Sequence, residues 1–241
     1  MYNSLIKQPL EPQKLYNCRF SLGECLIAQG EIEKAKKMYL EIEEEFRADK
    51  NPYWIKAIVS LGKIVYFQGE FEAALHYLNQ LSIYDIEEKY LSEESLNNGL
   101  NLRMLIRHYW HDSAEPLRLL ARAEYYETRG EYDKAVVSLD SIITDHTDSN
   151  LVPYGLLKKG SLLITLKLYN KSIATLEQFL EQYPSHNLTD KALERLGWLY
   201  QQEGKSKQAA AYYEDLLTNF PSSLLKEEVR LRIRSLEKKE P

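Results

Sequence analysis

Glycine and proline are scarce in this sequence, which has ten glycines and eight prolines among 241 residues. Because these residues commonly form turns, their scarcity favours long helices joined by short turns. No stretch approaches the roughly 18 apolar residues of a membrane-spanning helix, and the first residues lack the apolar core of a secretory signal. We therefore expect no membrane span. The compartment stays open: cytoplasmic as the sequence stands, periplasmic if the chain was cut from a larger secreted protein.

Cysteine is rarer still, with only Cys18 and Cys25 in the chain. If both lie on one helix, a rise of about 1.5 Å per residue separates their Cα atoms by roughly 10 Å. A disulfide needs Cα atoms within about 7 Å. We therefore expect two unlinked thiols that take part in packing.

Motifs for chemistry are also missing. Neither glycine-rich phosphate loop, GxGxxG or GxxxxGK[ST], occurs in the sequence. His108 and His111 lie three residues apart on a predicted helix, but no third metal ligand is near them. The other histidines form no recognisable triad with serine and aspartate. We therefore predict no catalytic residue, no metal site and no cofactor, and we expect that the chain is not an enzyme.

The charge distribution gives no sign of a nucleic-acid-binding surface. The net charge is −5, which is mild for this length. Basic residues gather between Lys226 and Lys239, but glutamates interleave with them, and cations suit the C-terminal end of a helix. We therefore predict no nucleic-acid partner.

The sequence repeats itself around five turn positions. Apolar residues recur before and after each turn at spacings of three, four and seven, which are helical spacings. Each unit therefore reads as a helix, a turn and an antiparallel helix. The turn residues are Gly30, Gly69, Gly130, Lys167 and Gly204.

Small residues occupy one equivalent place, seven positions before each turn. A glycine inside a helix costs about 1 kcal/mol relative to alanine, so a recurring glycine needs a compensating cause. We predict that it allows the second helix of the same unit to approach closely. The residues at this place are Gly23, Gly62, Ala123, Gly160 and Gly197.

Several substitutions depart from the repeat pattern, including Ser206 in the fifth unit, where the others carry an isoleucine or an aromatic residue. Lys167 replaces the turn glycine of the fourth unit. Arg122 and Lys159 stand where the other units carry a leucine just before the small residue. These changes weaken single units without changing the assignment.

Segments such as LGECLIAQGEIEKAKKMYLEI and LGWLYQQEGKSKQAAAYYEDLLTNFP resemble tetratricopeptide repeats, with a Leu-Gly pair, a turn glycine, an alanine and then an aromatic residue. The last two units have a 37-residue period and end in QYP and NFP, which resembles the repeats of bacterial cell-envelope assembly proteins. The resemblance implies an all-α, right-handed α-solenoid of about five helix hairpins. It also implies a protein-binding function, because this fold serves many protein partners.

The predicted architecture is one solenoid domain over residues 1–241. The extra residues between the second and third units contain an apolar stripe that predicts an inserted helix near 93–110, followed by Ser113 as an N-cap. A charged helix with one apolar face near 222–239 reads as a capping helix. The five repeats are predicted near 14–48, 52–82, 115–147, 151–184 and 188–221.

A partner segment would lie on the concave face, which the first helix of each unit lines in such a solenoid. Aromatic residues on that face are the candidate anchors, because buried aromatic side chains dominate interface energies. Some of them could instead pack against the inserted helix or the next unit. The predicted partner-binding residues are Phe20, Tyr66, Phe67, Tyr154 and Trp198.

The leading hypothesis is therefore a non-enzymatic scaffold that binds a protein or peptide segment. An alternative is a regulatory or targeting domain of a larger enzyme or envelope-assembly machine. A third hypothesis is a sensor whose curvature changes when a peptide binds. The sequence leaves open the partner's identity, the oligomeric state, the role of the inserted helix, and whether the chain is a complete protein or a fragment.

Overall fold

The computed structural model describes residues 11–82, 86–90, 93–111 and 114–237, and all regular secondary structure in these ranges is helical. The predicted all-α fold class is confirmed. The chain divides into two compact units, residues 1–131 and 132–241. That these units together form a single solenoid domain stays a prediction.

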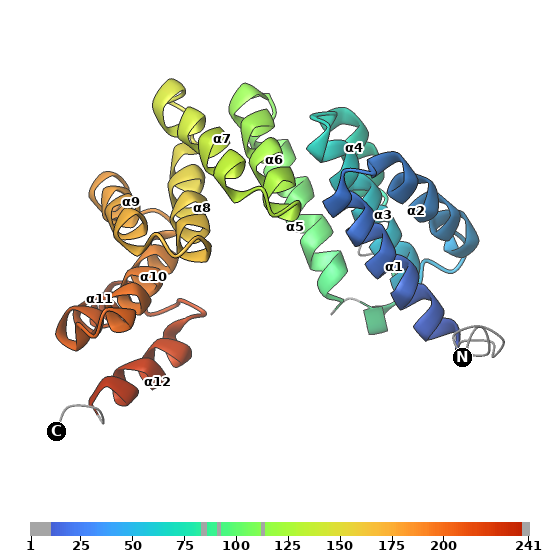
Figure 1. The fold of residues 1–241 in the computed structure, drawn as a ribbon. Helices are drawn as coiled ribbons and strands as arrows, with labels where there is room; N and C mark the ends of the chain where they lie inside the picture. The colour runs from blue at the N-terminus through green and yellow to red at the C-terminus, as the bar shows by residue number, and fades with distance from the viewer. Residues whose placement is uncertain (1–10, 83–85, 91–92, 112–113, 238–241) are drawn as a thin grey trace, which may run out of the picture. The chain divides into compact units, whose positions relative to one another are not determined.

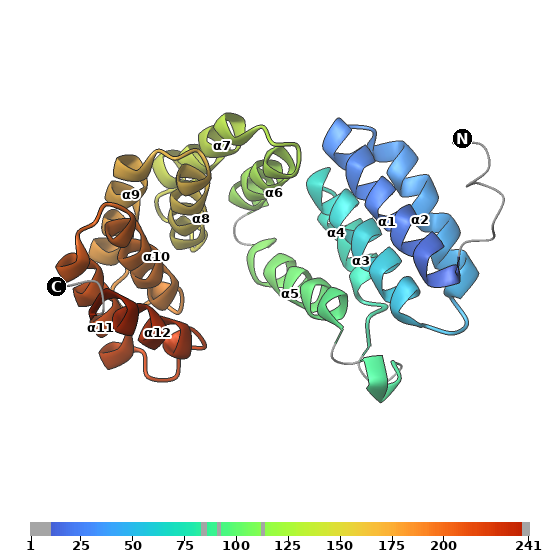
Figure 2. The ribbon, with the colours of Figure 1, turned by 60° about the horizontal axis from the view of Figure 1, so that its bottom comes forward.

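The first unit holds two helix hairpins and two further helices (Figures 1 and 2). Each hairpin is formed by consecutive antiparallel helices, and the second helix of the first hairpin packs against the first helix of the next. A short 3-10 turn, Glu88–Tyr90, precedes the fifth helix. The helices are α1 (Pro12–Gln29), α2 (Ile32–Phe46), α3 (Pro52–Phe67), α4 (Phe71–Leu78), α5 (Glu94–Tyr109) and α6 (Ala114–Thr128).

The second unit repeats this packing. The described helices follow one another as a single helix, two hairpins and a final helix, each packed on the one before it. They are α7 (Tyr132–Asp145), α8 (Val152–Thr165), α9 (Tyr169–Gln182), α10 (Thr189–Gln202), α11 (Ser206–Asn219) and α12 (Lys226–Glu237).

All five predicted turns share one backbone geometry. After α1, the N–H of Gly30 donates to the carbonyl of Ile27 at 3.0 Å and the N–H of Glu31 donates to the carbonyl of Leu26 at 2.8 Å. This pair of hydrogen bonds is the Schellman motif, which requires a left-handed residue at the turn position. The same pair recurs at the other four turns. Lys167 adopts the left-handed conformation, with φ 58°, although it has a side chain.

The recurring small residues allow the close approach that was predicted. A Cβ atom added to Gly62 or Gly160 would lie 2.9 or 2.7 Å from the leucine opposite it on the second helix of the hairpin. At Gly23 and Gly197 it would lie closer still to a buried tyrosine ring. Because these contacts are too short for a side chain, glycine is required where the two helices touch.

The inserted helix predicted near 93–110 corresponds to α5, Glu94–Tyr109. It packs against α3 and α4, with Gly99 so close to Val59 that an added Cβ would lie 2.6 Å from it. Arg103 donates to the carbonyls of Leu78 at 3.3 Å and Leu81 at 2.9 Å. Leu78 is the last residue of α4 and Leu81 follows it, so Arg103 caps a second helix of only eight residues. The predicted N-cap Ser113 lies outside the described residues.

The capping helix α12 begins at Lys226, later than the predicted start at 222. Val229 and Leu236 on one face are buried. Arg232 binds Glu194 of α10 at 3.2 Å, which fastens α12 to the hairpin before it. The last predicted residues, 238 and 239, lie outside the described part of the chain.

One prediction about packing is wrong. Cys18 and Cys25 are unlinked, as expected, but both are exposed rather than packed. They lie on a face of α1 that no described helix covers.

Candidate partner-binding surfaces

The predicted aromatic anchors in the first unit are core residues. Phe20 is 1% exposed, because its ring stacks on Tyr39 with centroids 5.7 Å apart and the Lys56 ammonium lies over it at 4.7 Å. Tyr66 and Phe67 are also buried. These rings hold neighbouring hairpins together, so they offer little surface to a partner.

Tyr66 and Phe67 join the second hairpin to α6. The Phe67 ring lies 5.5 Å from that of Tyr125, and the Tyr66 ring lies 5.9 Å from that of Phe71. Burial of the Tyr66 hydroxyl and the nearby Glu124 carboxylate raise the pKa of Tyr66 well above its usual value. The insertion of α5 leaves α6 packed directly on α3, and this packing covers both rings.

Tyr154 and Trp198 belong to the second unit and are both half-buried. Trp198 meets Tyr169 of α9 edge-on, with ring centroids 6.1 Å apart. Part of its indole surface stays exposed, so among the predicted anchors it keeps surface on which a partner could pack.

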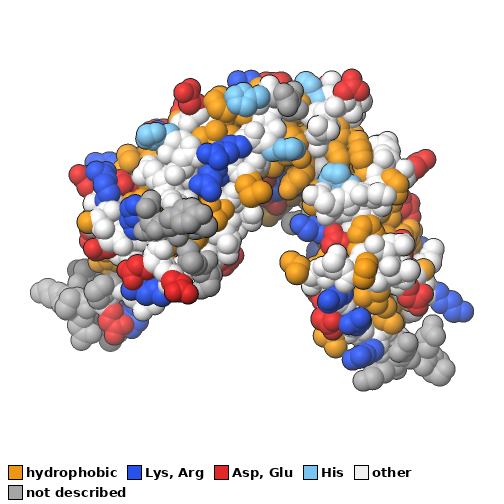
Figure 3. Space-filling model, turned by 180° about the vertical axis from the view of Figure 1, so that it is seen from behind, with side chains coloured by type: hydrophobic (Ala, Val, Ile, Leu, Met, Phe, Trp, Pro, Cys, Tyr) orange, Lys and Arg blue, Asp and Glu red, His pale blue; other side chains and the backbone are white. Residues whose placement is uncertain are grey.

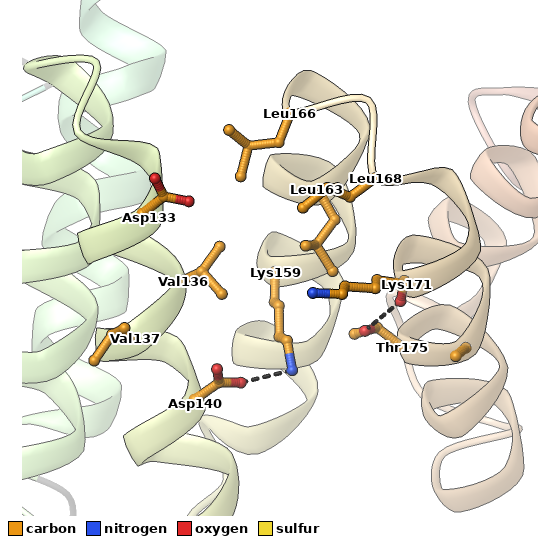
Figure 4. Close-up of a pocket in the computed structure, with 11 residues that line it drawn as sticks. Asp133, Val136, Val137, Asp140, Lys159, Leu163, Leu166, Leu168, Lys171 and Thr175 are labelled. Carbon is orange, nitrogen blue, oxygen red and sulfur yellow. Dashed lines mark hydrogen bonds and ion pairs between the residues drawn. The ribbon is translucent and has the colours of Figure 1, made fainter.

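A cavity of about 470 Å³ lies between α7, α8 and α9 (Figure 4). Two helices present residues to it at helical spacing: Asp133, Val136, Val137 and Asp140 from α7, and Lys171, Ala174 and Thr175 from α9. The remaining residues come from α8 and the turn that follows it: Lys159, Leu163, Leu166 and Leu168. We call these eleven residues the α7–α9 pocket.

The inner wall of the α7–α9 pocket is apolar. Leu163 is buried, whereas Val137 is 65% exposed and Leu168 40% exposed. The Thr175 hydroxyl donates to the Lys171 carbonyl at 2.8 Å, so its polar group is satisfied within α9. An apolar side chain could therefore enter the pocket and pack on this wall without leaving a buried polar group unpaired.

Lys159 closes one end of the pocket by binding Asp140 of α7 at 2.6 Å (Figure 4). This contact explains why a lysine stands where other units have a leucine. The alkyl chain of Lys159 lies along α8, and its ammonium group reaches Asp140 on α7. The departure from the repeat pattern thus builds part of the pocket.

Two charged residues on the rim of the pocket, Asp133 and Lys171, are not neutralised by a described residue. Asp133 and Lys171 line the pocket from α7 and α9 respectively, and neither forms an ion pair with a described residue. They lie on opposite sides of the cavity (Figure 4). The rim therefore offers a negative group on one side and a positive group on the other.

The predicted anchors all lie on the first helices of the repeats, whereas this pocket is lined largely by the second helices α7 and α9. A signal was present in the turn. The other units flank the turn position with polar residues, such as Gln29 and Glu31, whereas the fourth unit has Leu166 and Leu168. Both leucines line the pocket.

A second cavity of about 520 Å³ lies where α9 and α11 end and α10 begins. Its lining is more polar, and the Asn219 amide donates to Asp215 within it. It is lined by Leu180, Pro184, Ser185, Thr189, Asp215, Asn219 and Phe220.

Within the described ranges, no group of three His, Cys, Asp or Glu residues is placed to hold a metal ion. No helix there is both long and apolar enough to cross a membrane. On the face that Figure 3 shows, described side chains of both charge signs are interspersed, so this face carries no broad region of one sign.

The tetratricopeptide repeat family model matches residues 18–47, 154–186 and 191–223. These segments fall in the first, fourth and fifth predicted repeats. Similar solved structures include MamA, at 17% identity over 87% of this chain and 96% of that one, with a TM-score of 0.42. Another is a tetratricopeptide repeat protein from Parabacteroides merdae ATCC 43184, at 17% identity over 93% and 74% of the two chains, with a TM-score of 0.45.

A third solved structure is the TPR2AB domain of yeast Sti1 in complex with pHSP90, at 14% identity over 92% of this chain and 85% of that one, with a TM-score of 0.46. No curated protein matches the chain. The hairpins and their shared turns define a helical repeat protein. The family match identifies tetratricopeptide repeats in the three matched segments.

Proposed function

We propose that this chain is a non-enzymatic protein-interaction module that holds an apolar side chain of a partner segment in the α7–α9 pocket. Tetratricopeptide repeats typically mediate protein–protein interactions, which supports the general function. The pocket supports the specific site, because it combines an apolar wall with charged groups that no described residue neutralises.

The size of the pocket suits one large side chain and the backbone around it. Its volume of about 470 Å³ falls within the range of about 300–1,000 Å³ that is usual for ligand pockets. Full burial of a leucine, methionine or phenylalanine side chain contributes about 1.5–3 kcal/mol. That is enough for one anchor of a modest-affinity interaction, with further contacts outside the pocket.

The rim charges define the chemistry of the partner segment. A segment that crosses from α7 to α9 would pass Asp133 on one side and Lys171 on the other. We therefore infer an apolar residue with a basic residue on one side and an acidic residue on the other. Such a pair would favour one direction of binding over its reverse, because the reverse places like charges together.

The first-helix face of the second unit is a second candidate surface for the same function. Trp198 supports it, because the indole is half-exposed and tryptophan is enriched among energetically dominant interface residues. Tyr154 lies on α8, the first helix of the hairpin before it. A partner bound there would lose affinity when Trp198 is changed and would tolerate changes in the pocket.

An affinity capture with matched variants tests the proposal and separates the two surfaces. Ala174→Arg fills the pocket from an exposed helical position, and Ala211→Arg makes the same change at the equivalent exposed position of α11, 37 residues later. We expect partners bound by the wild type and by Ala211→Arg to be lost from Ala174→Arg. Loss only from Trp198→Ala assigns binding to the first-helix face, and equal capture by all variants contradicts both surfaces.

Once a partner segment is known, a charge exchange tests its direction. Lys171→Glu should weaken binding by about tenfold, and replacing the partner's acidic residue by lysine should restore it. Lys207→Glu, at an exposed lysine in the first turn of α11, is the control for net charge. Isothermal titration calorimetry would measure each affinity.

The chain could exert this function within a larger enzyme or envelope-assembly machine. The resemblance of its two 37-residue repeats to those of bacterial cell-envelope proteins favours such a setting. In that case the captured partner would be another component of the machine.

A further inference from the structure

The first helix of each later hairpin uses one face to pack on the hairpin before it. Trp54 of α3 donates to Glu43 of α2 at 3.4 Å, and Lys159 of α8 binds Asp140 of α7. The residues of this face follow a spacing of three, four and three. They are Trp54, Ala57, Leu61 and Ile64 in α3, Val152, Gly155, Lys159 and Leu162 in α8, and Thr189, Ala192, Leu196 and Leu199 in α10, and all but Lys159 are buried.

No described helix covers the equivalent face of α1. Leu15 is 42% exposed and Leu22 54% exposed, and Cys18 and Cys25 are exposed as well. We call these four residues the α1 stripe. The stripe has the same spacing of three, four and three, so its side chains lie on one side of the helix over a length of about 15 Å.

The last described helix, α12, has a different exposed face. On α12 the exposed side is charged, with Glu227, Arg230 and Arg234 all exposed. Such a polar face suits a helix side in contact with water. Leu231 is 64% exposed among these charges, so the α1 stripe of another molecule would meet a single exposed leucine flanked by charged groups, and charged groups are depleted at the core of an interface, which disfavours head-to-tail association.

The α1 stripe is complementary to itself. If two α1 helices lie antiparallel about residue 20, Leu15 of one copy lies opposite Cys25 of the other, and Cys18 lies opposite Leu22. Each large side chain thus meets a small one, which is the condition for close helix packing. At the ends of the stripe the exposed Glu11 lies opposite the exposed Gln29, so a carboxylate meets an amide donor rather than a like charge.

We propose that two copies of this chain associate through antiparallel α1 helices, with the two α1 stripes packed against each other. The pairing is isologous, as in most homodimers. One helix pair forms a small interface, at the low end of specific interfaces, below about 1,200 Å² in total. We therefore expect a reversible dimer with a dissociation constant in the range of about 1–100 µM.

Sedimentation equilibrium of the full chain tests this association across a concentration series. Leu22→Glu places a charge in the middle of the stripe and should raise the dissociation constant at least tenfold. Leu231→Glu makes the same change at an exposed leucine of α12 and should leave the dissociation constant unchanged. A wild-type chain that stays monomeric up to 1 mM would overturn the proposal, as would equal weakening by both variants.

Disulfide trapping tests the antiparallel register. In a protein carrying Cys18→Ser and Leu15→Cys, the thiols at positions 15 and 25 lie about 15 Å apart within one helix and cannot link there. Across the proposed interface they face each other, so mild oxidation should give a covalent dimer. Cys18→Ser alone should stay monomeric, because the two Cys25 residues lie at opposite ends of the pair.

A covalent dimer of the Cys18→Ser protein would indicate parallel helices and overturn the proposed register. An oxidised double variant that stays monomeric would do the same. Circular dichroism of each variant confirms that the helices are intact. Neither outcome depends on the α7–α9 pocket, so this proposal and the proposed function fail independently.

Discussion

Gly197 of α10 lies directly against the ring of Tyr213 on α11, and a Cβ atom added to Gly197 would lie 2.8 Å from the ring's Cζ atom and closer still to its edge. Tyr213 is completely buried, so its ring cannot move out into solvent. Gly160 faces Leu176 in the same way one hairpin earlier. A leucine can adjust by rotation about its side-chain bonds, whereas an aromatic ring cannot shorten its reach.

We therefore predict that Gly197→Ala destabilises the chain more than Gly160→Ala does. Alanine gains about 1 kcal/mol of helix propensity over glycine, and overpacking a core costs about 1–3 kcal/mol. The expected net loss is about 1–2 kcal/mol for Gly197→Ala and close to zero for Gly160→Ala. Urea denaturation followed by circular dichroism measures both, and adding Tyr213→Ala should abolish the extra cost at Gly197. Equal losses at both glycines would contradict this explanation.

The helices were predictable because each unit repeats the same local signals. The turn glycines, the small residues before them and the helical spacing of apolar residues all agree, and the inserted helix α5 was placed to within one residue at each end. These features depend on neighbours within about 40 residues. They could be read from the sequence without knowledge of the tertiary structure.

The exposed surface was harder to predict, because it depends on which helix covers which. Tyr66 and Phe67 were assigned to an open face, but α6 packs on α3 and buries them. The α7–α9 pocket arises from the spacing of two second helices and from Lys159, which reaches from α8 to Asp140. Contacts between side chains of helices in different repeats are hard to predict from the repeat pattern, because that pattern mainly records packing within each repeat.

Lys167 is strained relative to the glycines at the other turns. Its φ of 58° lies in the left-handed region, where a residue with a Cβ atom costs about 1–2 kcal/mol. Lys167→Gly should relieve this strain, offset in part by the greater flexibility of glycine in the unfolded chain. We expect a stabilisation of about 0.5–1 kcal/mol, measured as a rise in the urea midpoint.

The reciprocal change provides the control for Lys167. No atom lies within 4 Å of a Cβ atom added to Gly204, so Gly204→Ala reports the backbone cost without a clash. We expect it to destabilise the chain by about 1 kcal/mol. A stabilisation by Gly204→Ala would show that the left-handed geometry of these turns is not the source of the effect.

Glu43 links the first two hairpins, and its contacts favour the charged form of its carboxyl group. Arg47 donates to its two oxygens at 2.9 and 2.8 Å, and Trp54 of α3 lies 3.4 Å away. The hydrogen bonds from Arg47 lower the pKa of Glu43. Stability from this group is therefore complete above the carboxyl's ordinary pKa of about 4.5 and is lost as the pH falls below it.

Glu43→Gln should consequently matter at neutral pH and not in acid. We expect a loss of about 1 kcal/mol at pH 7, at the low end for charge-assisted hydrogen bonds because solvent screens the Arg47 side. The difference between variant and wild type should shrink as the pH is lowered from 5 to 3. Urea titrations at four pH values would test this, and a difference independent of pH would contradict the role of the charge.

The pKa of Glu194 is shifted in the opposite direction from that of Glu43. Burial raises the pKa of this carboxyl, and Arg232 of α12 partly offsets the rise from 3.2 Å away. Arg232→Gln removes the compensating cation and should raise the pKa of Glu194 further. Because a raised pKa favours the folded state only while the group is protonated, the cost of this variant should grow as the pH rises through that pKa.

We expect Arg232→Gln to destabilise the chain by about 2 kcal/mol at pH 7, less than the 3–5 kcal/mol of a fully buried pair because both groups are partly exposed. At pH 4 the loss should be smaller, since the protonated Glu194 no longer needs a cation. Combining Arg232→Gln with Glu194→Gln should recover part of the stability at pH 7 and remove the pH dependence. If the double variant is no more stable than Arg232→Gln alone, α12 is held by its apolar face, through Val229 and Leu236, and not by this ion pair.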